Sequence, residues 1–168
     1  RKYDVEDIVD WNWVMKWGKE RFWEFCKISH DIEFITCIPP INASLTTGFL
    51  NVASKYGMDV KVVTHQVNGV KAKVAITEWL SHHGWVGFIK VVVVVDSQEK
   101  KTNVDFDVIV DDNPEVCVKA VGMGRKAFLF DRPWNRGAKI GGFRRVDNLY
   151  DVILYLFKDM GGGFVWKV

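Results

Sequence analysis

Short apolar runs that alternate with helix-like stripes are the feature that most constrains this fold. Valine-rich runs lie at 60–64, 89–95 and 106–110, and a fourth apolar run lies at 126–130. Unbroken runs of β-branched residues are typical of strands buried on both faces, as in parallel sheets. Apolar residues between these runs recur at helical spacing. The pattern predicts an α/β fold, a Rossmann-like parallel sheet with helices on both faces.

Four helical stripes accompany the strands, and a short extended segment is expected at 143–146. Ser44 is placed to cap the first stripe, and Asp147 to cap the last, because short polar side chains accept hydrogen bonds from the first backbone N–H groups of a helix. Pro114 is placed in the first turn of the third helix, where its missing N–H costs nothing. The stripes run over residues 45–56, 70–80, 114–122 and 149–157.

The chain divides into three regions. Residues 1–44 are rich in aromatic residues, have helical spacing and end at two consecutive prolines, which predicts a small helical cap region. Residues 45–160 form the α/β core, and residues 161–168 are an apolar tail that begins with glycines. A length of 168 residues suits one domain with a small appendage.

Charge and cysteine usage exclude several classes of protein. Lys and Arg number 23 and Asp and Glu 21, a net charge of +2, which gives no reason to expect nucleic-acid or membrane binding. No apolar run is long enough to span a bilayer. The three cysteines have no C-x-x-C spacing, which favours reduced thiols over a zinc site. We therefore expect a cytoplasmic protein without a sequence-specific nucleic-acid partner.

Polar residues gather where the predicted strands end. Thr64 and His65 follow the first strand, Lys101 follows the second, and Asp111 and Asp112 follow the third. Ligands of parallel sheets bind beyond the carboxyl ends of the strands. Two adjacent carboxylates in a dry site require a cation, and Mg²⁺ suits them. With a Lys and a Thr nearby, the set indicates phosphoryl transfer.

A structural interpretation of the same residues stays open. Asp111 and Asp112 could cap the helix that Pro114 opens, and Lys101 could be a solvated loop charge. The basic segment 132–145, which begins with Arg132, could steer a phosphate or form a solvated surface.

Several motifs resemble those of one enzyme superfamily. Thr64 after a strand, Lys101 ten residues before Asp111, and DVIVDDNPE (107–115) resemble the second, third and fourth motifs of haloacid-dehalogenase-like phosphohydrolases. KKTNVDFDVIVDDNPE (100–115), AFLFDRPWNR (127–136) and DVEDIVDWNW (4–13) are similar to the 5'-nucleotidase branch. That branch holds the cytosolic-type 5'(3')-deoxyribonucleotidases and their bacterial and phage relatives.

The resemblance implies a role for each matching residue. Thr64 would hydrogen-bond a phosphoryl oxygen, and Lys101 would neutralise the phosphate and position the nucleophile. Asp111 and Asp112 would anchor Mg²⁺. His65 stands where relatives often have a small polar residue. It could bind substrate, or it could be an exposed polar residue of the loop.

The resemblance also implies a substrate, a nucleoside 5'-monophosphate, and allows a homodimer. In the resembling branch the cap stacks on the base of the nucleotide. Trp13 and Trp17, two of the 8 tryptophans, offer suitable faces, although helical aromatics also pack inward. Arg132, at the start of the basic segment, is a candidate for steering the substrate phosphate, with the solvated surface as the alternative.

The first motif of the superfamily, an Asp-x-Asp after a strand, is absent from the sequence. In relatives its first Asp forms an aspartyl-phosphate, and its strand is central in the sheet. We expect this segment before Arg1, in a truncated part of a complete enzyme. There are two alternatives. The segment could come from another chain, or the protein could be a catalytically inactive relative. The function expected is therefore Mg²⁺-dependent hydrolysis of nucleotides. The alternatives are an inactive nucleotide-binding or structural protein and a phosphatase for a non-nucleotide phosphate.

Overall fold

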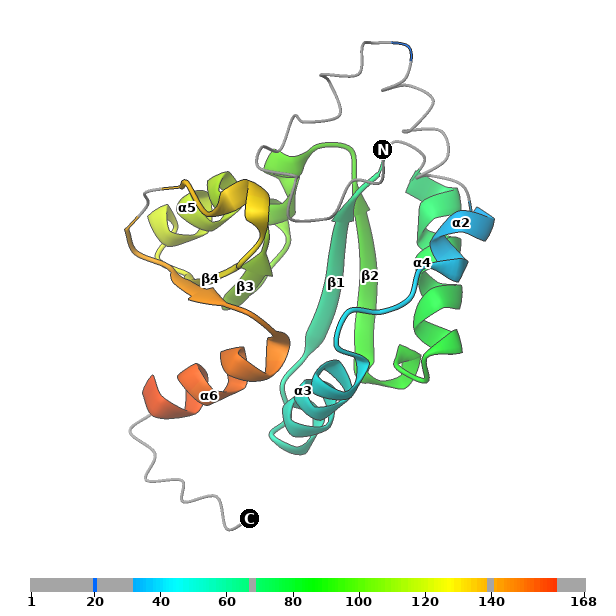
Figure 1. Ribbon diagram of the computed structural model, residues 1–168, viewed down its shortest axis with the longest axis horizontal. Helices are drawn as coiled ribbons and strands as arrows, with labels where there is room; N and C mark the ends of the chain where they lie inside the picture. The colour runs from blue at the N-terminus through cyan, green and yellow to red at the C-terminus, as the bar shows by residue number, and fades with distance from the viewer. Residues whose placement is uncertain (1–19, 21–31, 67–68, 139–140, 160–168) are drawn as a thin grey trace.

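The fold is described from a computed structural model for residue 20 and for residues 32–66, 69–138 and 141–159. Strands and helices alternate along most of the chain (Figure 1). Most of the predicted cap region and all of the tail 161–168 lie outside the described residues. In chain order, the elements are α2 (Ile32–Cys37), α3 (Ala43–Lys55), β1 (Val60–His65), α4 (Gly69–His82), the 3₁₀ turn η3 (Val86–Phe88), β2 (Ile89–Val95), η4 (Gln98–Asn103), β3 (Val108–Asp111), α5 (Pro114–Gly122), β4 (Lys126–Phe130), η5 (Pro133–Asn135), β5 (Arg144–Val146) and α6 (Leu149–Asp159).

The strands form two parallel sheets. In the first sheet β1 pairs with β2, and in the second β4 pairs with β3 on one side and β5 on the other. Parallel pairing with helical crossovers confirms the predicted Rossmann-like α/β class. Within the described residues, no ladder of hydrogen bonds joins the two sheets.

Each sheet has an apolar core of its own. The first core forms where α3 and α4 cover the first sheet, and includes Leu50, Leu80, Trp85 and Val92. In the core of the second sheet, Cys117 and Ala120 of α5 pack against Ala127 and Leu129 of β4. On the other face of that sheet α6 contributes Val152, which packs with Phe128 and Val146. Figure 1 shows α3 and α6 close together at one end of the molecule, and Tyr56 just after α3 meets Phe157 of α6 at 4.7 Å between ring centroids.

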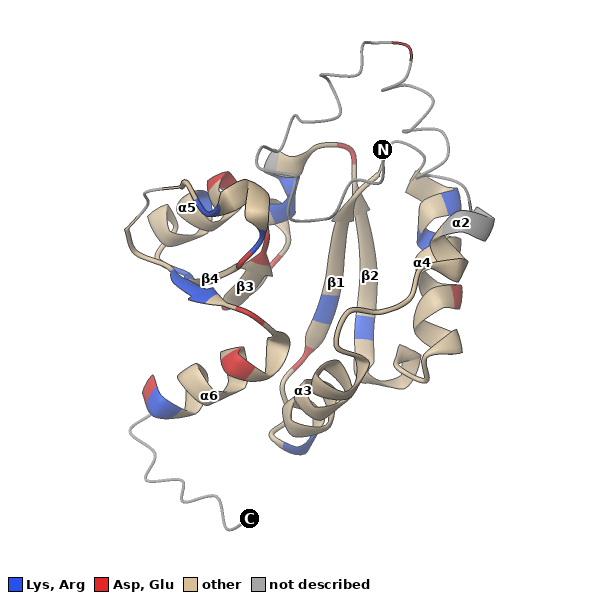
Figure 2. Ribbon diagram, in the orientation of Figure 1, with Lys and Arg blue, Asp and Glu red and all other residues tan. Residues whose placement is uncertain are grey.

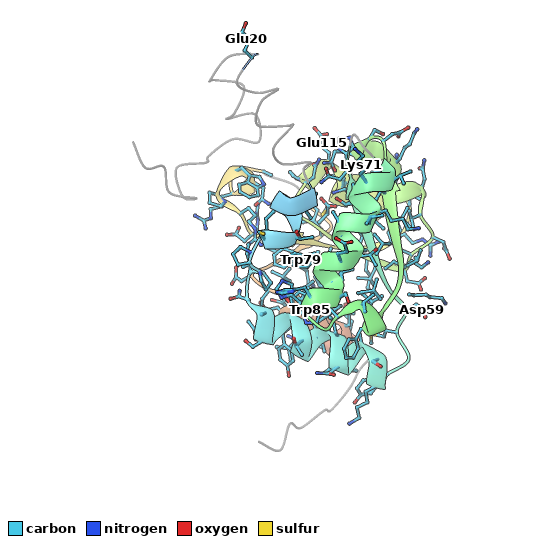
Figure 3. All side chains as sticks on the ribbon, turned by 90° about the vertical axis from the view of Figure 1, so that its right-hand side faces the viewer. Glu20, Asp59, Lys71, Trp79, Trp85 and Glu115 are labelled. Carbon is cyan, nitrogen blue, oxygen red and sulfur yellow. The ribbon has the colours of Figure 1, made fainter. Side chains whose placement is uncertain are left out.

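Two tryptophans join α4 to its neighbours (Figure 3). The rings of Trp79 and Trp85 lie 5.4 Å apart. Trp79 Nε1 donates to the carbonyl oxygen of Ile38 at 2.6 Å, and Trp85 Nε1 donates to the hydroxyl of Thr47 at 2.9 Å. The two indoles therefore act as core residues with satisfied N–H groups and fix the end of α2 and the start of α3 against α4.

Two predicted helix caps are wrong by one or two residues. α3 begins at Ala43, so Ser44 lies inside it, and the N-cap position is taken by Asn42 in the left-handed conformation. α6 begins at Leu149, and Asn148, not Asp147, accepts the N–H of Asp151 at 3.0 Å. Asn148 and Asp147 are equally good caps by type, so local sequence does not decide between them.

A cavity of about 780 Å³ separates the two sheets. Its walls include β1 residues 60–63 and all of β3, residues 108–111, while α3 and α6 supply apolar side chains. The edges of β1 and β3 that border it carry no strand partner among the described residues. Among the described residues, no strand lies between these two edges.

Charge is spread over the molecule. Figure 2 shows Lys and Arg interleaved with Asp and Glu over the helices and strands, in keeping with the small net charge of +2. Of the helices that the structure describes, none has both the length and the apolar character to cross a bilayer.

Candidate active site

A buried ion pair lies at the carboxyl end of β3. Asp111 is the last residue of this strand, and Lys101 on η4 places its Nζ 2.8 Å from Asp111 Oδ2. Lys101 is 9% exposed and Asp111 8% exposed. Lys101 is therefore not the solvated loop charge of the structural interpretation.

The second oxygen of Asp111 is also engaged. Asp111 Oδ1 accepts the backbone N–H of Asn113 at 2.9 Å. The next turn is closed by Asn113 itself, whose side chain accepts the N–H of Glu115, and Pro114 stands in the first turn of α5. Asn113 is thus the cap of α5, and the two carboxylates before it are not needed for that purpose.

Asp112 carries a charge that its surroundings disfavour. Burial raises the pKa of the Asp112 carboxyl, and the negative charge of Asp111 raises it further. Lys101 and Arg132 oppose this shift only in part. A divalent cation beside the two carboxylates would remove the penalty.

The donors present fit a magnesium ion held jointly with a substrate. No cluster of three or more His, Cys, Asp or Glu side chains occurs in the described part of the chain, so the carboxylates of Asp111 and Asp112 are the donors available. Mg²⁺ is commonly held by one or two carboxylates together with waters and phosphate oxygens.

Thr64 and His65 lie at the carboxyl end of β1, in the first sheet. Thr64 pairs with Val94, and η4, which carries Lys101, packs against β1. The ring of His65 has Nε2 3.1 Å from the carbonyl oxygen of Asp96, in the loop after β2. The structure therefore ties His65 to a neighbouring loop, and a role in substrate binding stays a prediction.

Arg132 borders the same cavity as Lys101 and Asp111. Its guanidinium stacks over the ring of Phe130, 4.6 Å from the centroid, and donates to the carbonyl oxygen of Asp131 at 2.8 Å. Lys101, Asp111 and Arg132 thus share one cavity, whose lining does not include Thr64, His65 or Asp112. Trp13 and Trp17 lie outside the described residues, so their predicted contact with a base stays a prediction.

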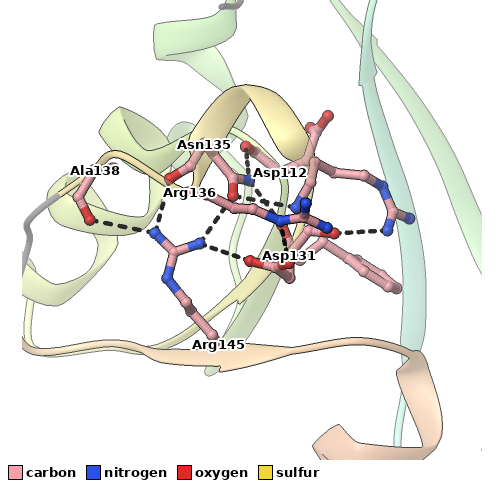
Figure 4. A network of polar contacts seen from close by, with 8 residues as sticks. Asp112, Asp131, Asn135, Arg136, Ala138 and Arg145 are labelled. Atoms are coloured by element: carbon pink, nitrogen blue, oxygen red, sulfur yellow. Dashed lines mark hydrogen bonds and ion pairs between the residues drawn. The ribbon is translucent and has the colours of Figure 1, made fainter. Parts of the chain in front are cut away.

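Sequence reasoning missed a polar network in the loop after β4 (Figure 4). Asn135 and Arg145 are its centre, and Asn135 donates to the backbone of Asp112 at 2.9 Å. The one signal in the sequence is an Asn-bearing turn, RPWN (132–135), directly after a buried strand. That signal indicates a turn but does not tell what the amide contacts.

A thiol lies beneath the carboxylates. Cys117 is fully buried, and its Sγ lies 3.8 Å from the carbonyl oxygen of Asp111 and 3.6 Å from that of Phe128. Burial raises the pKa of Cys117 to about 12, with a further contribution from the charge of Asp111. The side chain is therefore a neutral thiol that packs the core, as expected from the sequence.

Most of the chain, residues 1–158, matches the family described as 5' nucleotidase, deoxy (pyrimidine), cytosolic type C protein. No curated protein matches the chain. The matched range includes every residue that the strand ends placed in the candidate site.

Proposed function

The chain belongs to the cytosolic type C family of 5'-nucleotidases, a branch of the haloacid-dehalogenase-like hydrolases, and we propose that it hydrolyses nucleoside 5'-monophosphates, ribose or deoxyribose, with Mg²⁺. Family membership supports a nucleotidase. The observation that carries the residue assignments is the buried pair Lys101–Asp111 at the end of β3, with the carboxylate of Asp112 next to it, and the raised pKa of Asp112 supports a cation at this position. The cytosolic type in the family name supports a cytoplasmic location.

Each group at the strand ends has a task in this proposal. Asp111 and Asp112 hold Mg²⁺, which when bound neutralises charge on the phosphoryl oxygens. Lys101 adds a positive charge that also lies against the phosphoryl group, and the Thr64 hydroxyl donates to one of its oxygens. Arg132 borders the cavity that Lys101 and Asp111 also border, and its guanidinium donates to the phosphate there.

The proposed mechanism is double displacement through an aspartyl-phosphate. An Asp carboxylate attacks phosphorus, the bond to the 5' oxygen breaks, and the nucleoside leaves after taking a proton from a second Asp. Water then attacks phosphorus and gives a proton to the second Asp, the bond between phosphorus and the first carboxylate breaks, and inorganic phosphate leaves, so both Asp residues return to their starting state. Both carboxylates belong to the Asp-x-Asp motif, which we assign to a strand outside the printed sequence.

The cavity between β1 and β3 is the position that we propose for this strand. The cavity is bordered on one side by β1 residues 60–63 and on the other by β3 residues 108–111, and the facing edges of both strands have no strand partner among the described residues. A strand between them would lie in the cavity that Lys101 and Asp111 also border.

The test is a phosphate-release assay on the natural protein that contains this chain, with deoxynucleotides, ribonucleotides and sugar phosphates as substrates and Mg²⁺ present. We expect nucleotide hydrolysis that Lys101→Ala and Asp112→Ala reduce by at least about a hundredfold, as is typical when charge stabilisation of the transition state is lost.

Lys100→Ala is the matched control, because Lys100 is the exposed neighbour of Lys101 and pairs with Asp96. Unchanged turnover in both site variants would refute the assignments. Hydrolysis of sugar phosphates alone would favour the phosphatase alternative, and no hydrolysis of any substrate would favour an inactive relative.

A further inference from the structure

Asn135 is a buried amide whose hydrogen-bonding capacity is fully used. The residue is 1% exposed. Its Nδ2 donates to the carbonyl oxygens of Asp112 at 2.9 Å and Phe130 at 2.7 Å. Its Oδ1 accepts the backbone N–H of Arg132 at 3.2 Å and Nη1 of Arg145 at 2.9 Å. An amide has two donors and two acceptor positions, so no capacity remains for a ligand.

The two carbonyl groups that Asn135 joins have a common position in the second sheet. The parallel ladder between β3 and β4 ends at Asp111 opposite Leu129. Asp112 and Phe130 are the next residues of the two strands. Asn135 therefore bridges the strands one step beyond their last backbone pair, at the point where Asp112 leaves the sheet.

Arg145 holds the bridging residue in place (Figure 4). From β5 its Nη1 also donates to Asp131 Oδ1 at 3.0 Å, and its Nη2 donates to the carbonyl oxygens of Asn135 at 2.7 Å and Ala138 at 3.2 Å. The planar guanidinium thus contacts the turn at four acceptors, which fixes the turn more firmly than a lysine could.

We propose that Asn135 is a positioning residue for the metal site, because it fixes the main chain of Asp112 and so aims its carboxylate. The inference rests on the proposed function, which gives Asp112 to Mg²⁺. Asp111 is held by its strand, by Lys101 and by the N–H of Asn113. Asp112 stands beyond the ladder, and the Asn135 amide supplies the fixed contact that the ladder no longer gives. Arg145 acts one step further out, by fixing Asn135.

The test is Mg²⁺ affinity, measured by titration calorimetry without substrate on the natural protein and its variants. Asn135→Asp keeps the size of the side chain and its two acceptor contacts but replaces the donor Nδ2 with an oxygen that faces two carbonyl groups. We expect Asn135→Asp and Asn135→Ala to weaken Mg²⁺ binding about 10- to 100-fold, the usual effect of losing a group that orients a metal ligand.

The matched control is Asn148→Ala, which removes another asparagine that makes two side-chain hydrogen bonds, both to Asp151 at the start of α6. The Asn148→Ala variant should lose stability but keep its Mg²⁺ affinity. If Asn135 has a purely structural role, the folded Asn135 variants should keep their Mg²⁺ affinity as well. If neither Asn135 variant folds, Arg145→Lys replaces them, with an expected loss of affinity of severalfold.

Mg²⁺ affinity within about twofold of the unmodified protein in the folded variants overturns the inference, as does an unmodified protein that binds no Mg²⁺. Phosphate release is measured separately. If the Asn135 variants bind Mg²⁺ more weakly but the unmodified protein hydrolyses no nucleotide, the proposed function alone is refuted. If the unmodified protein hydrolyses nucleotides but its Mg²⁺ affinity does not depend on Asn135, the positioning role alone is refuted.

Discussion

Removal of one partner from the Lys101–Asp111 pair is the sharpest test of the site as the structure describes it. Both side chains are nearly buried, with exposures of 10% and 7%, and Nζ lies 2.8 Å from Oδ2. Lys101→Met keeps the length of the side chain and removes its charge. Asp111→Asn keeps an oxygen that can accept the N–H of Asn113, so the start of α5 is retained.

The magnitude follows from the distance and the burial. At 2.8 Å and an effective dielectric constant of about 20, the attraction between the charges is about 6 kcal/mol. Taking the two ions out of water costs several kcal/mol each, so the intact pair has a net contribution near zero. Either single variant leaves one buried charge without its partner, and we expect each to lower the free energy of unfolding by about 3–5 kcal/mol.

Urea unfolding followed by circular dichroism measures these values. The double variant Lys101→Met/Asp111→Asn contains no unpaired charge from this pair, so its loss should be smaller than the sum of the single losses by about 6 kcal/mol, the attraction between the two charges. If the loss of unfolding free energy in the double variant equals the sum of the two single losses to within about 0.5 kcal/mol, the two side chains do not interact. That result would refute the description of the site as a buried pair.

Lys100→Met is the control for the loss of a lysine at this turn. Lys100 pairs with Asp96 at 2.6 Å, but the two side chains are 54% and 74% exposed. Exposed pairs contribute little to stability. The urea midpoint of this variant should stay close to that of the unmodified protein, while that of Lys101→Met falls.

Three further outcomes are expected. Asp112→Asn should raise the melting temperature at pH 7, because it removes a charge that burial and the neighbouring charge of Asp111 disfavour. Since the Asp112 pKa is raised above 3.8 by folding, stability in the unmodified protein should fall as the pH rises from 3.8 through the raised value, and this fall should be absent from the variant. Cys117, whose pKa is about 12, should resist thiol alkylation at pH 8 in the folded protein while exposed Cys37 reacts, as peptide mass spectrometry would show. Asp159→Asn should lower the melting temperature slightly at low salt and not at about 1 M NaCl, because the ion pair of Asp159 with Lys126 is exposed.

Each of these outcomes has a result that contradicts it. An Asp112→Asn variant that melts below the unmodified protein would mean that the carboxylate makes a favourable contact in the absence of a cation. Equal labelling of Cys117 and Cys37 would mean that β3 and α5 open readily. If Asp159→Asn lowers the melting temperature equally at low and high salt, the loss of stability comes from packing and not from the charge of Asp159.

The sequence predicted the gathering of Lys101, Asp111 and Asp112 because a simple rule places them. In a parallel sheet the carboxyl ends of the strands share one edge, so residues that follow the strands lie near one another without any knowledge of packing. The same periodicity located the strands and helices to within a few residues. It placed Asp111 after the third strand, whereas the structure shows the residue as the last member of β3.

Asn135 shows why the rest of the site could not be predicted. Its two carbonyl acceptors belong to the ends of β3 and β4, and its arginine partner comes from β5. The contacts of the amide with Arg132 and Phe130 are local, but those with Asp112 and Arg145 form only when β3 and β5 are in place. No pattern in one segment carries that information, and a polar residue in a turn is by type more often a local capping group.

The candidate site also depends on how the two sheets are placed. Thr64 belongs to the first sheet, and Asp111 to the second. The contacts that join the sheets include η4, which packs against both β1 and α5, and Lys61 Nζ, which donates to the carbonyl oxygen of Asp105 at 2.6 Å. The cavity between β1 and β3 leaves the remaining edge groups of both strands without a ladder. A strand in the cavity would pair with both edges and set the separation of Thr64 from Asp111 through two ladders of about 4.8 Å each. In the proposed enzyme, the segment that brings the nucleophile is therefore also the one that fixes the distance across which Thr64 and the metal carboxylates must act together on one phosphate.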